Sequence, residues 1–435
     1  MGGLSLAWIL GGLFALSYVA IALEHTLKIN KSATALIGAG LMWSVYALVM
    51  SDAVALTAQL NESLTGTAQI VFFLMGAMTI VEVVDAHNGF DVITARIRTT
   101  RLSPLAWLVG VLTFFLSAIL DNLTTTIVMV SLMKKLLDRR EDRWLFAGLI
   151  VIAANAGGAW SPIGDVTTTM LWIGGQITAT AIVKNVFLPS VVSLLVPLGL
   201  MAWWFSGRPV VPPPPERDMQ AEGSRTTLLE SRLMLVLGLG VLVLVPVFKA
   251  VTHLPPFMGV LLGLGLIWLV GDLLHRDKPD EQNRQFLTLA HALTRIDMAS
   301  IVFFVGILLS VAVLEHAHVL AALAQWLDVT VGRLDLIVII IGVFSAIVDN
   351  VPLVAASMGM YSLAQYPTDS FLWEFMAYCA GTGGSLLIIG SAAGVAAMGL
   401  ENIDFRWYLR RITGLALAGY LAGAATYILQ YQLVH

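Results

Sequence analysis

Charged side chains are scarce in this sequence of 435 residues. Asp, Glu, Lys and Arg make up 12% of it, about half the share of a typical soluble domain, whereas apolar residues make up 58%. This composition excludes a soluble globular enzyme, a disordered chain and a nucleic-acid-binding protein with a basic surface. We therefore predict an integral membrane protein that lies in lipid and has no nucleic-acid partner.

The sequence also lacks the motifs of several cofactor and enzyme classes. Cys379 is its one cysteine, so an internal disulfide is excluded. There is no Gly-x-x-x-x-Gly-Lys-Ser/Thr motif for ATP, no His-Glu-x-x-His motif or cysteine cluster for zinc or iron–sulfur, and no Gly-x-Gly-x-x-Gly motif after a strand pattern. We expect no cofactor, and no use of ATP by this chain alone.

Eight apolar stretches have roughly the 20 residues that a helix needs to cross a membrane. They are 5–23, 32–51, 66–84, 184–206, 232–250, 257–274, 298–315 and 407–431. The first stretch has no basic region before it and no clear cleavage site, so we predict a retained helix and not a signal peptide. The segment 51–65 is expected to be a loop.

Four further apolar stretches are interrupted. Two of them, 102–137 and 334–365, carry an Asp-Asn pair in the middle and are predicted as re-entrant hairpins. The other two, 145–177 and 372–400, contain glycine-rich breaks and are predicted as discontinuous transmembrane helices. Non-helical backbone at membrane depth is tolerated only where it faces protein or a wet cavity. The breaks are therefore candidates for a binding site.

Basic residues decide the predicted topology, because they concentrate in cytoplasmic segments. Both flanks of 102–137 are basic, with Arg101 before it and Lys134 and Lys135 near its end. This hairpin is therefore expected to enter and leave on the cytoplasmic side. The flanks of 334–365 are poor in basic residues, so the second hairpin is expected to enter from outside. The predicted topology has ten crossings of the cytoplasmic (inner) membrane and both termini on the outer side.

A proline-rich polar segment divides the chain. Segment 208–231 contains four consecutive prolines, so it is predicted as a cytoplasmic linker between the halves 1–207 and 232–435. The halves repeat, because Ser-Ala-Ile-Leu-Asp-Asn at 117–122 matches Ser-Ala-Ile-Val-Asp-Asn at 345–350, an offset of 228 residues (345 − 117). We predict an all-α integral membrane protein of two inverted repeats, each with a re-entrant hairpin and a discontinuous transmembrane helix, as in secondary transporters.

Two aspartates in the hairpins are the sharpest chemical feature. A carboxylate in hydrocarbon is costly unless it faces a cavity, where it binds or relays ions. Carboxylate, amide and hydroxyl oxygens suit a small hard cation, and a carboxylate can take a proton instead. We predict Na⁺ binding at Asp121, Asn122, Asp349 and Asn350, with Ser117 and Ser345 one helical turn earlier on the same faces. The alternative is a hydrogen-bonded pair that only pins each hairpin.

The glycine-rich breaks supply further candidates, because unwound carbonyls and half-helix ends can coordinate a cation. The candidates in the first break are Asn155, Gly157, Ser161, Asp165, Thr167 and Thr168, and those in the second are Thr382 and Ser385. Ser391 occupies the repeat position of Asp165, so the two halves are chemically asymmetric. Asp165 is a candidate for the extra proton or cation group. The alternatives are a helix-capping role for Asp165 and simple packing for the threonines.

Acidic and imidazole groups near helix ends form a third group of candidates. Histidine titrates near physiological pH, so these groups are candidates for pH sensing or gating. They are Glu82, Asp85, His87, Glu315 and His316. The alternative is that they are solvated groups at the membrane interface.

At these motifs the sequence resembles a known family. Segments 117–126, 155–172 and 345–353 look like those of the NhaD-type sodium/proton antiporters, members of the ion transporter superfamily. The resemblance implies exchange of Na⁺, often also of Li⁺, for H⁺ across the inner membrane. It also implies a homodimer in which a mobile part carries the hairpins against a scaffold. Dicarboxylate carriers of the superfamily have Ser-Asn-Thr where this chain has Asp-Asn-Leu and Asp-Asn-Val, which points to protons as the coupling ion.

Three other functions compete with antiport. A Na⁺-coupled anion carrier would need hydroxyl and amide donors for its substrate, and free aspartates would repel that substrate. An intramembrane aspartyl protease also uses two membrane aspartates, but here Gly164-Asp165 lacks a Tyr-Asp partner. A passive channel is disfavoured by the opposed hairpins. We therefore predict a secondary ion transporter that is not an enzyme.

Overall fold

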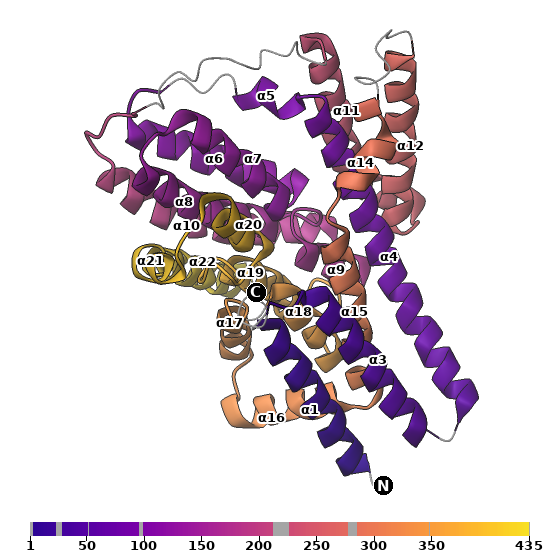
Figure 1. The fold of residues 1–435 in the computed structure, drawn as a ribbon. Helices are drawn as coiled ribbons and strands as arrows, with labels where there is room; N and C mark the ends of the chain where they lie inside the picture. Colours follow the sequence, from indigo (N-terminus) through magenta and orange to yellow (C-terminus); the bar gives the residue numbers. More distant parts are fainter. Residues whose placement is uncertain are drawn as a thin grey trace.

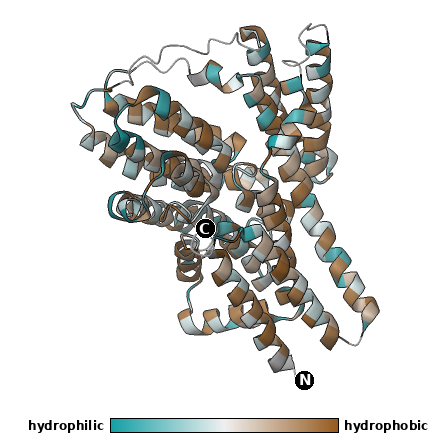
Figure 2. Ribbon diagram, in the orientation of Figure 1, coloured by the Kyte–Doolittle hydropathy of each residue, from teal (hydrophilic) through white to brown (hydrophobic). Residues whose placement is uncertain are grey.

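The computed structural model describes residues 3–22, 28–50, 52–94, 99–211, 226–276, 285–347 and 349–434. Every named element within these ranges is an α-helix (Figure 1). Seven of the described helices are long and apolar enough to cross a membrane, and up to eight spans result if the bent pair near the C-terminus counts as one. Hydrophobic residues dominate along these long helices (Figure 2). The prediction of an all-helical, multi-pass membrane protein is confirmed.

Among the described residues, nine helices precede the proline-rich segment and the others follow it. The first group is α1 (Gly3–Ala22), α3 (Lys31–Val49), α4 (Ala53–Ala86), α5 (Gly89–Thr94), α6 (Leu102–Leu120), α7 (Asn122–Leu136), α8 (Arg140–Ala159), α9 (Val166–Ile173) and α10 (Ala179–Trp204). The second group is α11 (Leu228–Thr252), α12 (Pro256–His275), α14 (Leu289–Arg295), α15 (Met298–His316), α16 (Val319–Val331), α17 (Leu334–Phe344), α18 (Asn350–Met360), α19 (Phe371–Gly383), α20 (Ala392–Glu401), α21 (Phe405–Arg411) and α22 (Thr413–Val434). Residues 212–225 of the predicted linker, including its four prolines, lie outside the described residues.

The expected loop at 51–65 is wrong, because α4 already begins at Ala53. The side chain of Asp52 caps this helix by accepting hydrogen bonds from the backbone N–H groups of Val54 and Ala55. Residues 53–65 contain neither glycine nor proline, so nothing ends the helix there, although polar residues lower the hydropathy. The predicted span 407–431 is also modified, since α21 and α22 meet at a bend of 51°.

The first Asp-Asn pair separates α6 from α7. Asp121 is at once the C-cap of α6 and the N-cap of α7, and its φ of 92° is rare for a residue other than glycine. Both outer ends of this helix pair contact the same short segment. The N–H of Leu102 donates to the carbonyl of Arg208 at 3.0 Å, and the N–H of Asp138 donates to that of Val211 at 2.9 Å. The beginning of α6 and the end of α7 therefore lie together.

The second Asp-Asn pair lies between α17 and α18, where residues 345–347 form a turn and Asp349 caps α18. Both of these helices have 11 residues, fewer than α6 or α7. The glycine-rich stretches are interrupted too. The chain leaves helical geometry after Ala159 and resumes it at Val166, and it does so again between α19 and α20.

The two halves make the same close contacts around these breaks. A Cβ atom on Gly157 would lie 2.1 Å from the carbonyl oxygen of Phe114, and one on Gly383 would lie 2.0 Å from that of Gly342. The hydroxyl of Ser117 donates to the carbonyl of Ala154 at 2.6 Å, and that of Ser345 donates to the carbonyl of Ala380 at 3.2 Å. In both halves, glycine and serine thus hold the helix before the Asp-Asn pair against the helix before the glycine-rich break.

Helices from the two halves also pack against each other. α10 lies along α22, α3 packs against α15, and α12 packs against α4. In Figure 1 the long helices α4, α11 and α12 stand on one side of the molecule, and α6, α7, α8 and α10 stand on the other. One side chain at each of the four breaks is buried, namely those of Asn122, Asp165, Asn350 and Ser391.

Candidate cation-binding site

Asp165 lies at the centre of a buried polar network. It caps α9, because its Oδ1 atom accepts the N–H of Thr167 at 3.2 Å. Its Oδ2 atom accepts hydrogen bonds from the side-chain amides of Asn122 at 3.4 Å and of Asn350 at 3.2 Å. The carboxylate group, only 2% exposed, therefore contacts the asparagine of both Asp-Asn pairs.

Asn155 extends the network to the fourth break. Its Oδ1 atom accepts a hydrogen bond from the amide of Asn122 at 3.1 Å. Its own amide donates to the carbonyl of Val151 at 2.9 Å and to the hydroxyl of Ser391 at 3.1 Å. Ser391 caps α20, so residues from all four helix interruptions meet here. Such a concentration of side-chain oxygen atoms in the core of a membrane protein is the composition of an ion site.

A small cavity of about 50 Å³ adjoins this network, with room for a few water-sized particles. Asp121, Asn122 and Asp165 line it together with apolar side chains that include Phe73 and Phe304. Within the part of the chain that the structure describes, no lysine and no arginine line it. Two carboxylates thus share one enclosed space, which favours a cation or a proton there.

Asp121 is held by its own helix. Its Oδ1 atom accepts the N–H of Thr124 at 2.7 Å, and its Oδ2 atom accepts the hydroxyl of Thr124 at 3.1 Å. These bonds fix the carboxylate at the start of α7, where backbone N–H groups favour negative charge. The sequence did not single out Thr124, although its position three residues after a capping aspartate is a recognisable signal.

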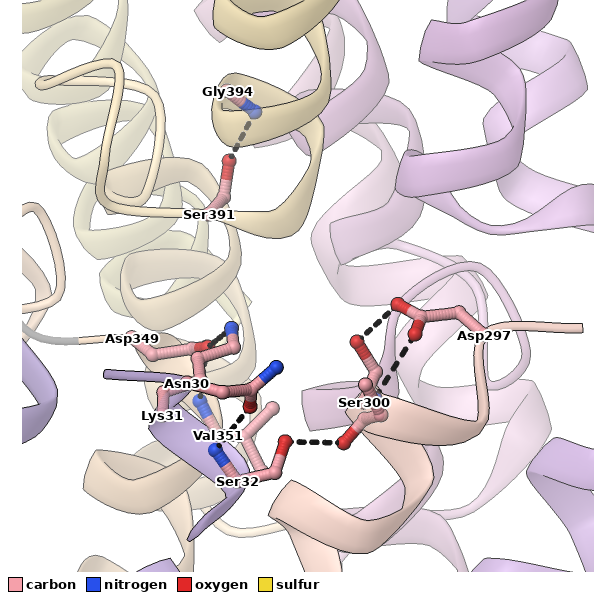
Figure 3. Close-up of polar contacts among 10 residues, drawn as sticks. Asn30, Lys31, Ser32, Asp297, Ser300, Asp349, Val351, Ser391 and Gly394 are labelled. Atoms are coloured by element: carbon pink, nitrogen blue, oxygen red, sulfur yellow. Dashed lines mark hydrogen bonds and ion pairs between the residues drawn. The ribbon is translucent and has the colours of Figure 1, made fainter. Parts of the chain in front are cut away.

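Asp349 has different surroundings from Asp121, although the two look alike in the sequence. It does not line the cavity described above. Its Oδ2 atom lies 3.4 Å from the ammonium nitrogen of Lys31, at the start of α3, and its Oδ1 atom accepts the N–H of Val351 at 3.4 Å (Figure 3). Lys31 is not recognisable as a site residue from the sequence, because no local pattern ties it to the second Asp-Asn pair.

Most of the remaining candidates near the Asp-Asn pairs and the glycine-rich breaks form hydrogen bonds with the backbone. Besides Ser117 and Ser345, the hydroxyls of Thr168 and Thr382 donate to the carbonyls of Asp165 and Tyr378 at 2.9 and 2.6 Å. The hydroxyl of Ser385 donates to the carbonyl of Thr382 at 2.7 Å, and that of Ser161 accepts the N–H of Ile163 at 3.4 Å. The hydroxyl of Thr167 is buried without a hydrogen-bond partner in the described part of the chain.

The five candidates for pH sensing lie apart from this network. Glu82 pairs with Arg295 at 2.6 Å, and Asp85 is exposed. His87 is buried, with its Nε2 atom 2.8 Å from the Nε2 atom of His275.

Glu315 and His316 lie together at the end of α15. They line a second cavity of about 240 Å³ together with Glu62. The Nε2 atom of His316 lies 3.1 Å from the hydroxyl of Ser63, so this cavity reaches the N-terminal half of α4. The acidic and imidazole candidates thus form separate groups at different helix ends.

A multi-pass helical protein whose interrupted helices meet at a buried polar network has the build of a secondary transporter. Comparisons with known proteins narrow this class. A family model described as "Citrate transporter" (CitMHS) matches residues 18–381. The chain is 51% identical to "Sodium/proton antiporter 1" of Arabidopsis thaliana over 97% of this chain and 72% of that protein.

Two further relatives agree with that match. The chain is 48% identical to "Sodium/proton antiporter 2" of Arabidopsis thaliana, over 96% of this chain and 98% of that protein. It is 31% identical to "Na(+)/H(+) antiporter NhaD" of Vibrio cholerae, over 96% and 90% of the two chains. The chain therefore belongs to the NhaD-type sodium/proton antiporter family of the ion transporter superfamily. This is a family of transporters and not of enzymes, so the hypothesis of an intramembrane protease is rejected.

Proposed function

We propose that this protein exchanges Na⁺, and also Li⁺, for H⁺ across the cytoplasmic membrane. The observation that carries the proposal is the position of Asp165, which accepts the amides of Asn122 and Asn350 and shares a cavity with Asp121. Because one carboxylate contacts both hairpin regions, binding of an ion or a proton to that carboxylate can change the conformation of both regions.

Competition at the carboxylates is the proposed coupling mechanism. Oxygen ligands of this kind hold a small hard cation, and a carboxylate that is protonated loses its charge and its affinity for that cation. Na⁺ and H⁺ then exclude each other from Asp121 and Asp165. A carrier that changes its facing with either ion bound, and not when it is empty, performs antiport.

Alternating access by inverted repeats is the second part of the proposal. The matching contacts of Gly157 with Phe114 and of Gly383 with Gly342 support a repeat. The shared contacts of Leu102 and Asp138 with residues 208–211 support a first hairpin that enters and leaves on one side. We propose that the second hairpin enters from the other side, that the chain crosses the membrane ten times and that both termini lie outside.

An elevator-like movement in a homodimer completes the proposed mechanism. In it the hairpins and discontinuous helices move together against the long helices α4, α11 and α12. In Figure 1, α6, α7, α8 and α10 stand on the other side of the molecule from these long helices, with a contact between α6 and α11, and this arrangement is consistent with the division. Surrounding lipid and a second copy of the chain are the proposed partners.

An anion carrier is the second candidate, and the "Citrate transporter" description of the matching family model favours it. The charges argue against it. Two carboxylates line the small cavity and no lysine or arginine of the described segments does, so a citrate ion would be repelled. The Lys31 ammonium also lies 3.4 Å from Asp349, which already balances part of its charge.

Liposomes that contain the purified protein and a trapped pH-sensitive dye test the proposal. Addition of Na⁺ or Li⁺ outside should expel internal protons and raise the internal pH, whereas K⁺ provides the comparison cation. Liposomes with protein carrying Asp165→Asn provide the matched control. Absence of proton movement with Na⁺, together with Na⁺-dependent uptake of labelled citrate, would establish the anion carrier instead.

A further inference from the structure

The carboxylates of the two hairpin aspartates are stabilised in different ways, and the sequence explains the difference. Thr124 gives Asp121 two hydrogen bonds, one from its backbone N–H and one from its hydroxyl. At the matching place in the second half stands Pro352, three residues after Asp349. Proline has no backbone N–H and no hydroxyl, so it cannot give Asp349 either bond. From its own helix Asp349 accepts the N–H of Val351 at its Oδ1 atom at 3.4 Å, and its Oδ2 atom has a partner from a different helix.

Lys31 supplies that partner from a distant helix. Its ammonium nitrogen lies 3.4 Å from Oδ2 of Asp349 (Figure 3). The same nitrogen lies 4.5 Å from the centre of the Phe303 ring. Phe303 belongs to α15 and is fully buried. The Lys31 and Asp349 side chains are 25% and 17% exposed, so water screens their attraction only in part.

The position of Lys31 is unfavourable for a cation in the absence of such partners. Lys31 is the first residue of α3, and the positive end of a helix dipole disfavours positive charge there. The helix start is nevertheless fixed, because Asn30 accepts the N–H of Ser32 at 2.8 Å and the hydroxyl of Ser32 donates to the carbonyl of Ala299 at 2.6 Å. Asp349 and the ring of Phe303 thus compensate for a placement that the local helix does not favour.

The partner of the Lys31 ammonium, Asp349, is adjacent in sequence to a residue of the polar network around Asp165. Asp349 precedes Asn350, whose amide donates to Asp165 at 3.2 Å. We propose that Lys31 is a built-in competitor of the transported cation at the second hairpin. Its ammonium occupies Asp349 while Na⁺ is absent, and it must leave when Na⁺ binds there. This inference rests on the proposed exchange of Na⁺ for H⁺.

Two substitutions of Lys31 are expected to shift the apparent affinity for Na⁺ in opposite directions. Lys31→Gln removes the competitor, so the Na⁺ concentration for half-maximal proton movement should fall about fivefold, as expected for the loss of a partly exposed ion pair. Lys31→Arg keeps the charge and offers a planar fork that binds a carboxylate more tightly, so the same concentration should rise. Lys28→Gln, an exposed lysine just before the same helix, should leave it unchanged.

A binding measurement that needs no transport completes the test. Na⁺ should protect the purified protein against thermal unfolding, and the Na⁺ concentration for half-maximal protection measures affinity. Lys31→Gln should lower this concentration in the wild-type background and leave it unchanged in an Asp349→Asn background. A shift of the same size in both backgrounds, or no shift in either, would overturn the role of Lys31. If the wild type moves no protons on addition of Na⁺, the proposed function fails instead.

Discussion

Asn350 donates its side-chain amide to the Oδ2 atom of Asp165 at 3.2 Å, across 185 residues of sequence. This bond joins the turn before α18 to the break before α9, so it connects the two halves of the chain. Asn122 donates to the same oxygen from the first half. A single buried carboxylate therefore contacts both Asp-Asn pairs.

Replacement of either cavity aspartate should abolish exchange without unfolding the protein. Asn caps a helix as well as Asp does, so Asp121→Asn and Asp165→Asn keep α7 and α9 capped while they remove the exchangeable charge. We expect normal yield and melting temperature. Na⁺-dependent proton movement should fall by about a hundredfold or more, because a group essential to the proton step is lost.

Asp404→Asn is the matched control for these variants. Asp404 caps α21 by accepting the N–H of Trp407 at 3.0 Å, and it does not line the cavity. This variant should transport like the wild type. Near-normal transport by Asp121→Asn or Asp165→Asn would remove that residue from the essential set.

Protons and Na⁺ should compete directly if they share these carboxylates. Protonation removes the charge that holds Na⁺, so affinity for Na⁺ should be weak at low pH and rise about tenfold per pH unit for each proton displaced, until the site is deprotonated. Addition of Na⁺ to purified protein in weak buffer should release protons, which a pH electrode records. A distant switch at His87 or His316 would change the maximal rate instead, with no such release.

The hairpins should be reached by water from opposite sides. Cysteines at Arg101→Cys and Asp138→Cys, in a Cys379→Ala background, should react with an impermeant reagent only from the cytoplasmic side. Arg333→Cys and Gln365→Cys should react only from outside. All four positions are exposed. If the two flanks of one hairpin reacted from opposite faces, that segment would be a crossing and the inverted-repeat proposal would be wrong.

Alanine should not be tolerated at the two glycines of the repeated contact. The added Cβ atom would lie 2.1 Å from a carbonyl oxygen at Gly157 and 2.0 Å at Gly383, so rigid backbone would have to move. We expect Gly157→Ala and Gly383→Ala each to lose roughly 3 kcal/mol of stability, or to fail to fold. Gly199→Ala, also inside a helix but with no atom within 4 Å of the added Cβ, is the control. Its melting temperature should be unchanged or higher.

Local patterns in the sequence were enough to predict most of the long apolar helices. Apolar runs of membrane length gave the helices of a multi-pass protein, because helical hydrogen bonds and hydrophobic residues act over short distances along the chain. The Asp-Asn pairs and glycine-rich breaks marked where helices stop. A local pattern failed at 53–65, where polar residues suggested a loop although no residue there ends a helix.

Only the tertiary structure decided which of the marked residues meet. Asp121 and Asp349 share one motif, yet the first faces a cavity with Asp165 and the second faces Lys31, 318 residues away in the chain. His87 meets His275 for the same kind of reason. Such pairings depend on how whole helices pack, and packing is set by the summed shape of many distant side chains rather than by a pattern that a short segment contains.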